Sequence, residues 1–155
     1  MVSYPFANIT VRPFVGINDV RNPYIFKDGT HVINVSQDWR EEVRDYVEQH
    51  SGTYDWIPLN EEPKMGVDNL LKAVTLLAKF DMLDSHTIVH CVGGNNRSRT
   101  VVEAYYFAKY GTHYEDEYKG FPNHLIYNCK SGYLPPLLEM EQILFKNNVI
   151  QNTKS

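Results

Sequence analysis

The sequence contains little cysteine: only Cys91 and Cys129 occur among its 155 residues. Two cysteines are too few for the disulfide framework of a small secreted domain, and they are compatible with a reducing compartment. Apolar runs long enough to span a membrane are also missing, and the N-terminal segment lacks the basic start and apolar stretch of a secretory signal. We therefore expect a cytoplasmic protein that has no membrane partner.

An excess of charge of one sign is missing as well. The formal net charge is −4 at pH 7, and neither acidic nor basic residues form a block. Proteins that hold a nucleic-acid backbone present a basic field, so nucleic acid is not expected as a partner. With 43% hydrophobic residues and no repeat or linker, the chain is predicted to form one domain over residues 1–155.

Four short segments have the composition of strands, because they are rich in β-branched or aromatic residues and are bounded by turn residues. They are residues 9–15, 31–36, 54–59 and 86–91. Helical patterns alternate with them. This order predicts an α/β fold: a central parallel or mixed sheet of four to five strands flanked by helices.

Four segments carry the apolar spacing of amphipathic helices. The first begins at a capping pair formed by Asp38 and Glu41, places Trp39 on its apolar face and ends near Gly52. The others cover residues 67–78, 98–109 and 137–146. Residues 112–136, rich in aromatic residues and proline, are predicted to form a loop with a short helix.

The segment that carries chemistry follows the last predicted strand and reads His90-Cys91-Val92-Gly93-Gly94-Asn95-Asn96-Arg97-Ser98. The carboxyl edge of a parallel sheet is where α/β folds place their ligands. Two consecutive glycines let the backbone amides curl around an anion, and the helix that begins near Ser98 adds the positive end of its dipole. The segment therefore predicts a phosphate or oxyanion site.

Arg97 lies six residues after Cys91, so a closed loop aims its planar fork of donors at two oxygens of a phosphate held over the sulfur. The same positive field favours a thiolate at neutral pH. A thiolate attacks phosphorus in line and forms a phosphocysteine that water hydrolyses. Cysteine, glycine and arginine at this spacing thus indicate phosphoryl transfer.

This segment resembles the HCxxGxxR(S/T) motif of the cysteine-based protein tyrosine phosphatase superfamily. The following Arg99-Thr100-Val101-Val102, the stretch 29–36 (GTHVINVS) and Gly132-Tyr133-Leu134 are similar to its dual-specificity branch. The resemblance covers most of the chain and implies a phosphatase domain of that fold.

The resemblance implies a role for each residue of the motif. Cys91 is the nucleophile, Arg97 the transition-state clamp, Ser98 the hydrogen-bond donor to the sulfur, and His90 a support of the loop. The backbone of Val92, Gly93, Gly94, Asn95 and Asn96 is expected to bind the phosphate together with Arg97, although Asn95 and Asn96 depart from the small or hydroxyl residues that the family commonly has at those positions. No cofactor and no metal are implied.

The general acid is less clearly marked, because the chain has no Asp at the family's position about thirty residues before the cysteine. Glu61 is nearest to that position, in a loop at the same sheet edge, and neighbouring Glu62 favours its protonated form. Asp68, near the start of the next helix, is the rival. Asp55 is expected to point away. The acid is therefore Glu61, Asp68 or absent.

The expected substrates are phosphotyrosine and phosphoserine or phosphothreonine in proteins, or a small phosphate ester. The loop carries no lysine, so inositol phospholipids are less expected. Two alternatives stay open: a phosphate-binding pseudophosphatase with weak activity, and another enzyme with a Cys-loop-Arg site, such as a sulfurtransferase or an arsenate reductase. A protective disulfide between Cys91 and Cys129 is a further hypothesis. The oligomeric state is not predicted.

Overall fold

The computed structural model describes residues 2–4, 8–59, 67–92 and 96–110. Its five strands are β1 (Val2–Tyr4), β2 (Ile9–Arg12), β3 (His31–Asn34), β4 (Tyr54–Trp56) and β5 (Thr87–His90). They form one sheet in the order β1-β2-β5-β3-β4. The four strands from β2 to β4 are parallel, and β1 pairs antiparallel with β2. The predicted mixed α/β sheet is confirmed.

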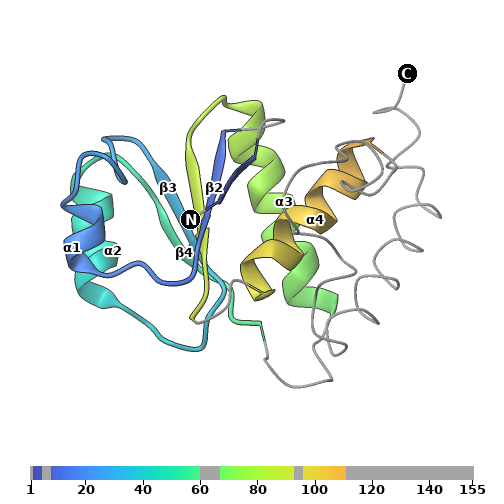
Figure 1. The fold of residues 1–155 in the computed structure, drawn as a ribbon, viewed down its shortest axis with the longest axis horizontal. Helices are drawn as coiled ribbons and strands as arrows, with labels where there is room; N and C mark the ends of the chain where they lie inside the picture. Colours follow the sequence, from blue (N-terminus) through green and yellow to red (C-terminus); the bar gives the residue numbers. More distant parts are fainter. Residues whose placement is uncertain (1, 5–7, 60–66, 93–95, 111–155) are drawn as a thin grey trace.

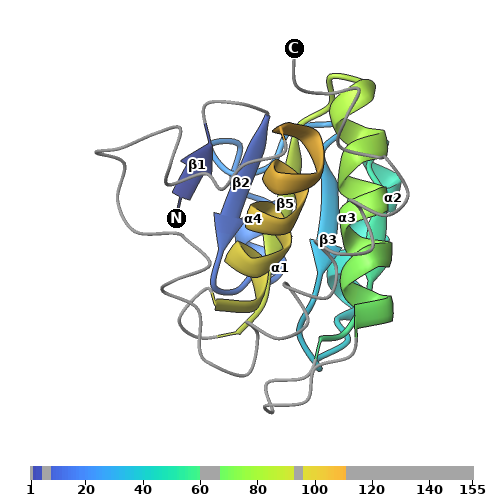
Figure 2. The ribbon, with the colours of Figure 1, turned by 90° about the vertical axis from the view of Figure 1, so that its right-hand side faces the viewer.

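Four helices complete this part of the chain: α1 (Ile17–Val20), α2 (Glu41–Gln49), α3 (Val67–Met82) and α4 (Asn96–Tyr110). Figure 1 shows α1 and α2 on one face of the sheet and α3 and α4 on the other. In Figure 2, α3 and α4 lie side by side in front of the strands. The described residues therefore form three layers with a core on each face of the sheet. No helix among them is both long and apolar enough to cross a bilayer.

Strand β5 lies at the centre of the sheet, and all four of its residues are buried. It pairs with β2 on one side and with β3 on the other. Thr87, Ile88 and Val89 are β-branched and suit a strand that is covered on both faces. Strand β5 thus ends at His90, in the middle of the carboxyl edge of the sheet.

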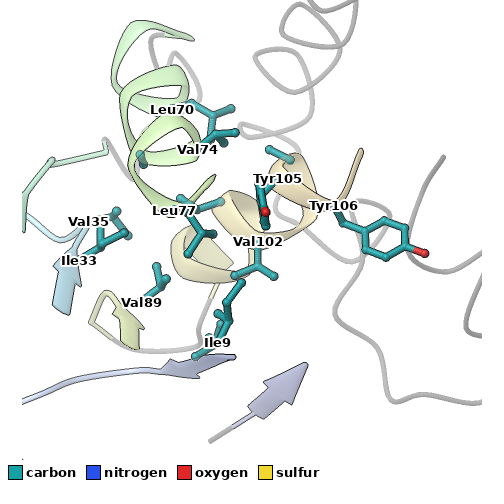
Figure 3. Packing of buried hydrophobic residues seen from close by; sticks show 14 of the residues in the cluster. Ile9, Ile33, Val35, Leu70, Val74, Leu77, Val89, Val102, Tyr105 and Tyr106 are labelled. Atoms are coloured by element: carbon teal, nitrogen blue, oxygen red, sulfur yellow. The ribbon is translucent and has the colours of Figure 1, made fainter. Parts of the chain in front are cut away.

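Successive side chains of a strand point to opposite faces of the sheet, so neighbouring residues belong to different cores. Ile33 and Val89 pack with residues of α3 and α4, as Figure 3 shows. Val32 and Ile88, their chain neighbours, pack with residues of α2 and of the segment around α1. Burial of each such side chain contributes about 1.5–3 kcal/mol, so both helical layers are held by the same strands.

The predicted cap of the helix after β3 is wrong. Helix α2 begins at Glu41 after Arg40, and no side-chain hydrogen bond caps it. Instead, the carbonyl of Asp38 accepts a hydrogen bond of 2.7 Å from Asn34 Nδ2. This contact belongs to an irregular turn that precedes the helix, so Trp39 lies before α2 and is partly exposed.

The other differences concern short elements and ends. Strand β1 and helix α1 were not predicted, and β2 ends at Arg12, because Pro13 has no N–H to continue a ladder. The predicted helices at 67–78 and 98–109 are confirmed and extend to Met82 and from Asn96 to Tyr110. The predictions for residues 112–136 and 137–146 lie outside the described residues.

Candidate active site

The candidate site lies at the carboxyl edge of the parallel strands. The register places His90 of β5 opposite Arg12 of β2 and Asn34 of β3. The chain segments that leave these strands therefore start at the same level. Cys91 follows β5 directly, and Leu59 follows β4 three residues after Trp56. The edge thus brings together segments that are far apart in the sequence.

Cys91 is buried, with 1% of its surface exposed, and packs in the core below α3 and α4. Its Sγ lies 3.4 Å from Oγ of Ser98, which is also buried and stands in the first turn of α4. A hydroxyl at this distance can donate a hydrogen bond to sulfur and so stabilise a thiolate. The strand-to-helix turn therefore joins the two predicted groups directly.

Arg97 is also buried and lies beside the same turn. Its guanidinium donates one hydrogen bond to the carbonyl of Leu59 (Nη1···O 3.4 Å) and one to the carbonyl of Val92 (Nη2···O 3.3 Å). The side chain therefore spans from the end of the β4 segment to the loop after Cys91. Val92 is 41% exposed, so solvent reaches the chain directly after Cys91.

The start of helix α4 adds a positive electrostatic field beside Arg97 and Ser98. It starts at Asn96, so the peptide N–H groups of its first turn and the positive end of its dipole lie next to Arg97 and Ser98. Both features favour an anion. A cation, a row of backbone donors and a sulfur atom are thus held together at one sheet edge.

His90 supports the loop from the opposite face of the sheet. Its imidazole is 1% exposed, and its Nδ1 lies 3.2 Å from the carbonyl oxygen of Cys91, to which it donates. Burial lowers the pKa of His90 to about 4, so the ring is neutral at pH 7. A neutral imidazole with its proton on Nδ1 fixes the Cys91 carbonyl without adding charge beside the sulfur.

No family model and no curated relative matches the chain by sequence. Solved structures do match by fold. PTPMT1 superposes with a TM-score of 0.72 at 17% identity, covering 90% of this chain and 93% of that one. It has also been crystallised in complex with PI(5)P, with a TM-score of 0.72 at 16% identity and 90% and 94% of the two chains covered.

Two phosphatase domains agree with this match. The Yvh1 phosphatase domain from Chaetomium thermophilum gives a TM-score of 0.61 at 16% identity, over 93% of this chain and 94% of its own. The catalytic core of the PP-IP phosphatase SIW14 from S. cerevisiae gives 0.60 at 14%, over 92% and 90%. This chain has the fold of the cysteine-based phosphatases.

Within this cysteine-phosphatase fold, sequence reasoning missed a buried polar network beneath the site. Asn34 is fully buried, and its Nδ2 donates to the hydroxyl of Tyr54 at 2.8 Å. Its Oδ1 accepts from the backbone N–H of Ser36 at 2.9 Å and from the Ser36 hydroxyl at 2.6 Å. The ring of Tyr54 lies 6.5 Å from that of His90. The network therefore fixes the segment after β3 next to the loop support.

Of the carboxylates considered as the general acid, the structure describes Asp68 and Asp55. Asp68 stands exposed in the first turn of α3, and Glu61 lies outside the described residues. Asp55, the middle residue of β4, is hydrogen-bonded to Thr53, which precedes the strand, and lies near His31 and Lys79; burial raises its pKa. These neighbours agree with the expectation that Asp55 points away from the site.

The remaining predicted site residues fall in or beside the loop. Gly93, Gly94 and Asn95 lie outside the described residues, as does Cys129, so the proposed disulfide stays a hypothesis. Asn96 is the first residue of α4. Among the residues that the structure describes, no group of three or more His, Cys, Asp or Glu side chains is placed to hold a metal ion.

Proposed function

We propose that this protein is a phosphatase that hydrolyses phosphate monoesters, foremost phosphotyrosine in proteins and also phosphoserine or phosphothreonine, through a phosphocysteine on Cys91. The observation that supports this most is the juxtaposition of Cys91 Sγ with Ser98 Oγ at 3.4 Å, next to the buried Arg97 at the start of α4. Nucleophile, sulfur partner and cation thus occupy the turn where the field favours an anion.

The reaction has two steps. The Cys91 thiolate attacks phosphorus as the ester P–O bond breaks, and the leaving oxygen takes a proton. The backbone of residues 92–96 and the Arg97 guanidinium bind the phosphoryl oxygens, and Arg97 exchanges its carbonyl partners for them. Water then attacks phosphorus, the P–S bond breaks, and inorganic phosphate leaves. Ser98 stabilises the sulfur as its negative charge returns.

The proton donor in the first step is proposed to be Glu61. The support for Glu61 is its position in the sequence, two residues after Leu59, whose carbonyl accepts a hydrogen bond from Arg97. Asp68 remains the second candidate. If neither acts, aryl phosphates with good leaving groups are hydrolysed and alkyl phosphates only slowly, which favours phosphotyrosine over phosphoserine.

Two other functions are each supported by a structural neighbour. PTPMT1 has been crystallised with PI(5)P, and this favours a small or lipid phosphate ester as the second substrate class. A further structural neighbour, described as a tyrosine phosphatase-like serine/threonine/tyrosine-interacting protein, matches with a TM-score of 0.57 at 19% identity over 76% of this chain and 80% of that one. It favours the alternative of a pseudophosphatase that binds phosphate.

The test is release of inorganic phosphate from an aryl phosphate, an alkyl phosphate, a phosphotyrosine peptide and PI(5)P. We expect turnover of the aryl ester and the peptide, and its loss in Cys91→Ser and Arg97→Lys. No phosphate release by the intact protein, with phosphopeptide binding retained, would establish the pseudophosphatase instead.

The acid is tested separately with the alkyl ester. Glu61→Gln is expected to lower kcat for the alkyl phosphate by about 100-fold or more and to remove the basic limb of its pH–rate profile, while the aryl ester is affected less. Asp68→Asn is measured in parallel, and the same losses in that variant would assign the proton donor to Asp68 instead. If Glu61→Gln leaves rate and profile unchanged, Glu61 has no part in the mechanism.

A further inference from the structure

The two tryptophans of the chain form an exposed surface beside the candidate site. Trp39 and Trp56 are the only tryptophans in the sequence, and they remain 40% and 41% exposed. Their ring centroids lie 5.5 Å apart. We call these two rings the tryptophan surface. Two large apolar rings side by side in solvent are uncommon for a folded domain and are typical of contact surfaces.

The tryptophan surface is held rigidly. Trp56 Nε1 donates a hydrogen bond of 2.8 Å to the carbonyl of Ser36. Trp39 packs edge-on against the ring of Tyr54, with centroids 5.6 Å apart. Because Tyr54 is itself fixed by Asn34, neither ring needs to be ordered when a partner binds. Such preorganised rings contribute contact area at low entropic cost.

The tryptophan surface continues toward the phosphate site. Tyr54 lies between them, with its ring 5.6 Å from Trp39 and 6.5 Å from His90, which holds the Cys91 carbonyl. Trp56 ends β4 in register with Asn34 and so shares the carboxyl edge of the sheet with Cys91. A chain whose phosphate enters the loop therefore passes near the tryptophans.

The charge around the tryptophan surface is negative. The Arg44 guanidinium lies over the Trp39 ring, 5.3 Å from its centroid. It contacts three carboxylates, those of Glu41 at 3.3 Å, Asp45 at 3.0 Å and Glu48 at 3.6 Å. One cation cannot balance three anions, and residues 38–48 carry five carboxylates against two arginines. This excess attracts a cationic partner and repels an anionic lipid surface.

Resting on the proposed protein-phosphatase function, we propose that Trp39 and Trp56 recognise the segment that flanks the phosphorylated residue of a protein substrate. The segment carries an apolar or aromatic side chain, which packs on the rings, and a lysine or arginine, which meets the carboxylates of α2. The phosphate supplies affinity common to all substrates, and this surface selects among them.

The binding experiment uses the fluorescence of the two tryptophans, which reports on this surface alone. Cys91→Ser protein is titrated with a phosphotyrosine peptide flanked by leucine and arginine, and with the same peptide carrying glutamate in place of arginine. We expect the basic peptide to shift the emission and to bind about tenfold more tightly, with the difference shrinking at high salt. Equal affinities for the two peptides would overturn the proposal.

Substitutions at this surface test the proposal in turnover assays. Trp39→Ala is expected to raise KM for the basic peptide about tenfold and to leave kcat/KM for a small aryl phosphate within about twofold. Glu48→Lys reverses the charge of an exposed carboxylate beside Arg44, near the C-terminal end of α2 where a cation is favourable, and is expected to weaken binding of the basic peptide. Tyr24→Ala, a 94% exposed aromatic in the segment before β3, is the control without effect.

The remaining outcomes separate the two proposals. Emission shifts with the unphosphorylated basic peptide and no turnover of any ester would uphold the tryptophan surface and refute the phosphatase. Equal losses for peptide and aryl ester in Trp39→Ala, while Glu48→Lys has no effect, would refute the surface alone. A shift produced by anionic phosphatidylserine vesicles and by neither peptide would also refute it, in favour of a membrane contact.

Discussion

At the scale of single residues, the site depends on a turn of only a few residues. Cys91 and Ser98 are seven positions apart, yet Sγ and Oγ lie 3.4 Å apart, so the residue after β5 meets the first turn of α4. The hydroxyl is proposed to stabilise the sulfur as it leaves phosphorus. A donor aimed at a developing charge typically supplies about 2.7–4 kcal/mol when the site is dry, and Ser98 is buried.

Ser98→Ala is therefore expected to slow hydrolysis of the phosphocysteine by about 100-fold, while attack by Cys91 changes less. Breakdown of the intermediate then becomes rate-limiting. A rapid-mixing experiment with an aryl phosphate measures this as a burst of the phenol product equal to the enzyme concentration. Ser98→Thr keeps the hydroxyl and should show no burst. Loss of attack and hydrolysis to the same degree in Ser98→Ala would contradict this role.

The sequence predicted the residues of this turn because they are close in the chain, and their spacing alone limits the geometry. Asn34 and Tyr54 could not be found in the same way. Their hydrogen bond joins positions 20 residues apart and exists because β3 and β4 pair in one particular register. A buried asparagine at the end of an apolar strand is the only signal that the sequence offers, since buried amides need partners.

At the scale of elements, the contact of α3 with α4 includes a polar group as well as the apolar core. Asp81, near the end of α3, accepts hydrogen bonds from the hydroxyl of Tyr105 and from Lys109 Nζ, the latter at 2.8 Å. Burial and the Asp81 carboxylate raise the pKa of Tyr105, so its hydroxyl stays a donor. Because α4 carries Arg97 and Ser98 in its first turn, this contact helps to fix the helix that presents the site.

Asp81→Ala is expected to lower the free energy of unfolding by about 1–3 kcal/mol, because two donors lose a largely buried acceptor. Tyr105→Phe should cost about 1 kcal/mol, and urea denaturation measures both. Glu41→Ala removes an exposed ion pair of α2 and is the control, with an effect below about 0.5 kcal/mol. An Asp81→Ala protein as stable as this control would show that the contact adds nothing.

The elements that the sequence predicted correctly are those with long apolar periodicity, such as α3, or with continuous β-branched composition, such as β5. Strand β1 has three residues and α1 four, which is too short for any periodicity to be recognised. The capping error has a different cause. The Asp38 and Glu41 pattern was present, but Asp38 belongs to a turn in which its carbonyl accepts a hydrogen bond from Asn34, four residues earlier, and the helix begins only at Glu41.

At the scale of the whole molecule, stability depends on imidazoles that the fold keeps neutral. Burial lowers the pKa of His90 to about 4, and it also lowers the pKa values of His31 and His86. In the unfolded chain these histidines are protonated below about pH 6.5, whereas in the folded chain protonation requires a lower pH. Between pH 6.5 and about 4 the unfolded state therefore binds more protons, and acidification weakens the fold.

We expect the free energy of unfolding to fall as the pH is lowered from about 6.5 to 4, with His90 contributing at most about 3 kcal/mol of the loss. His90→Asn removes that titration. Urea denaturation at several pH values should show that the free energy of unfolding falls less steeply with acidification in the variant, whatever its stability at pH 7. Subtracting the two curves removes the contributions of His31, His86 and Asp55, which titrate in both proteins. Because a cationic His90 is disfavoured only where the fold buries it, parallel declines in both proteins would place the acid sensitivity elsewhere in the molecule.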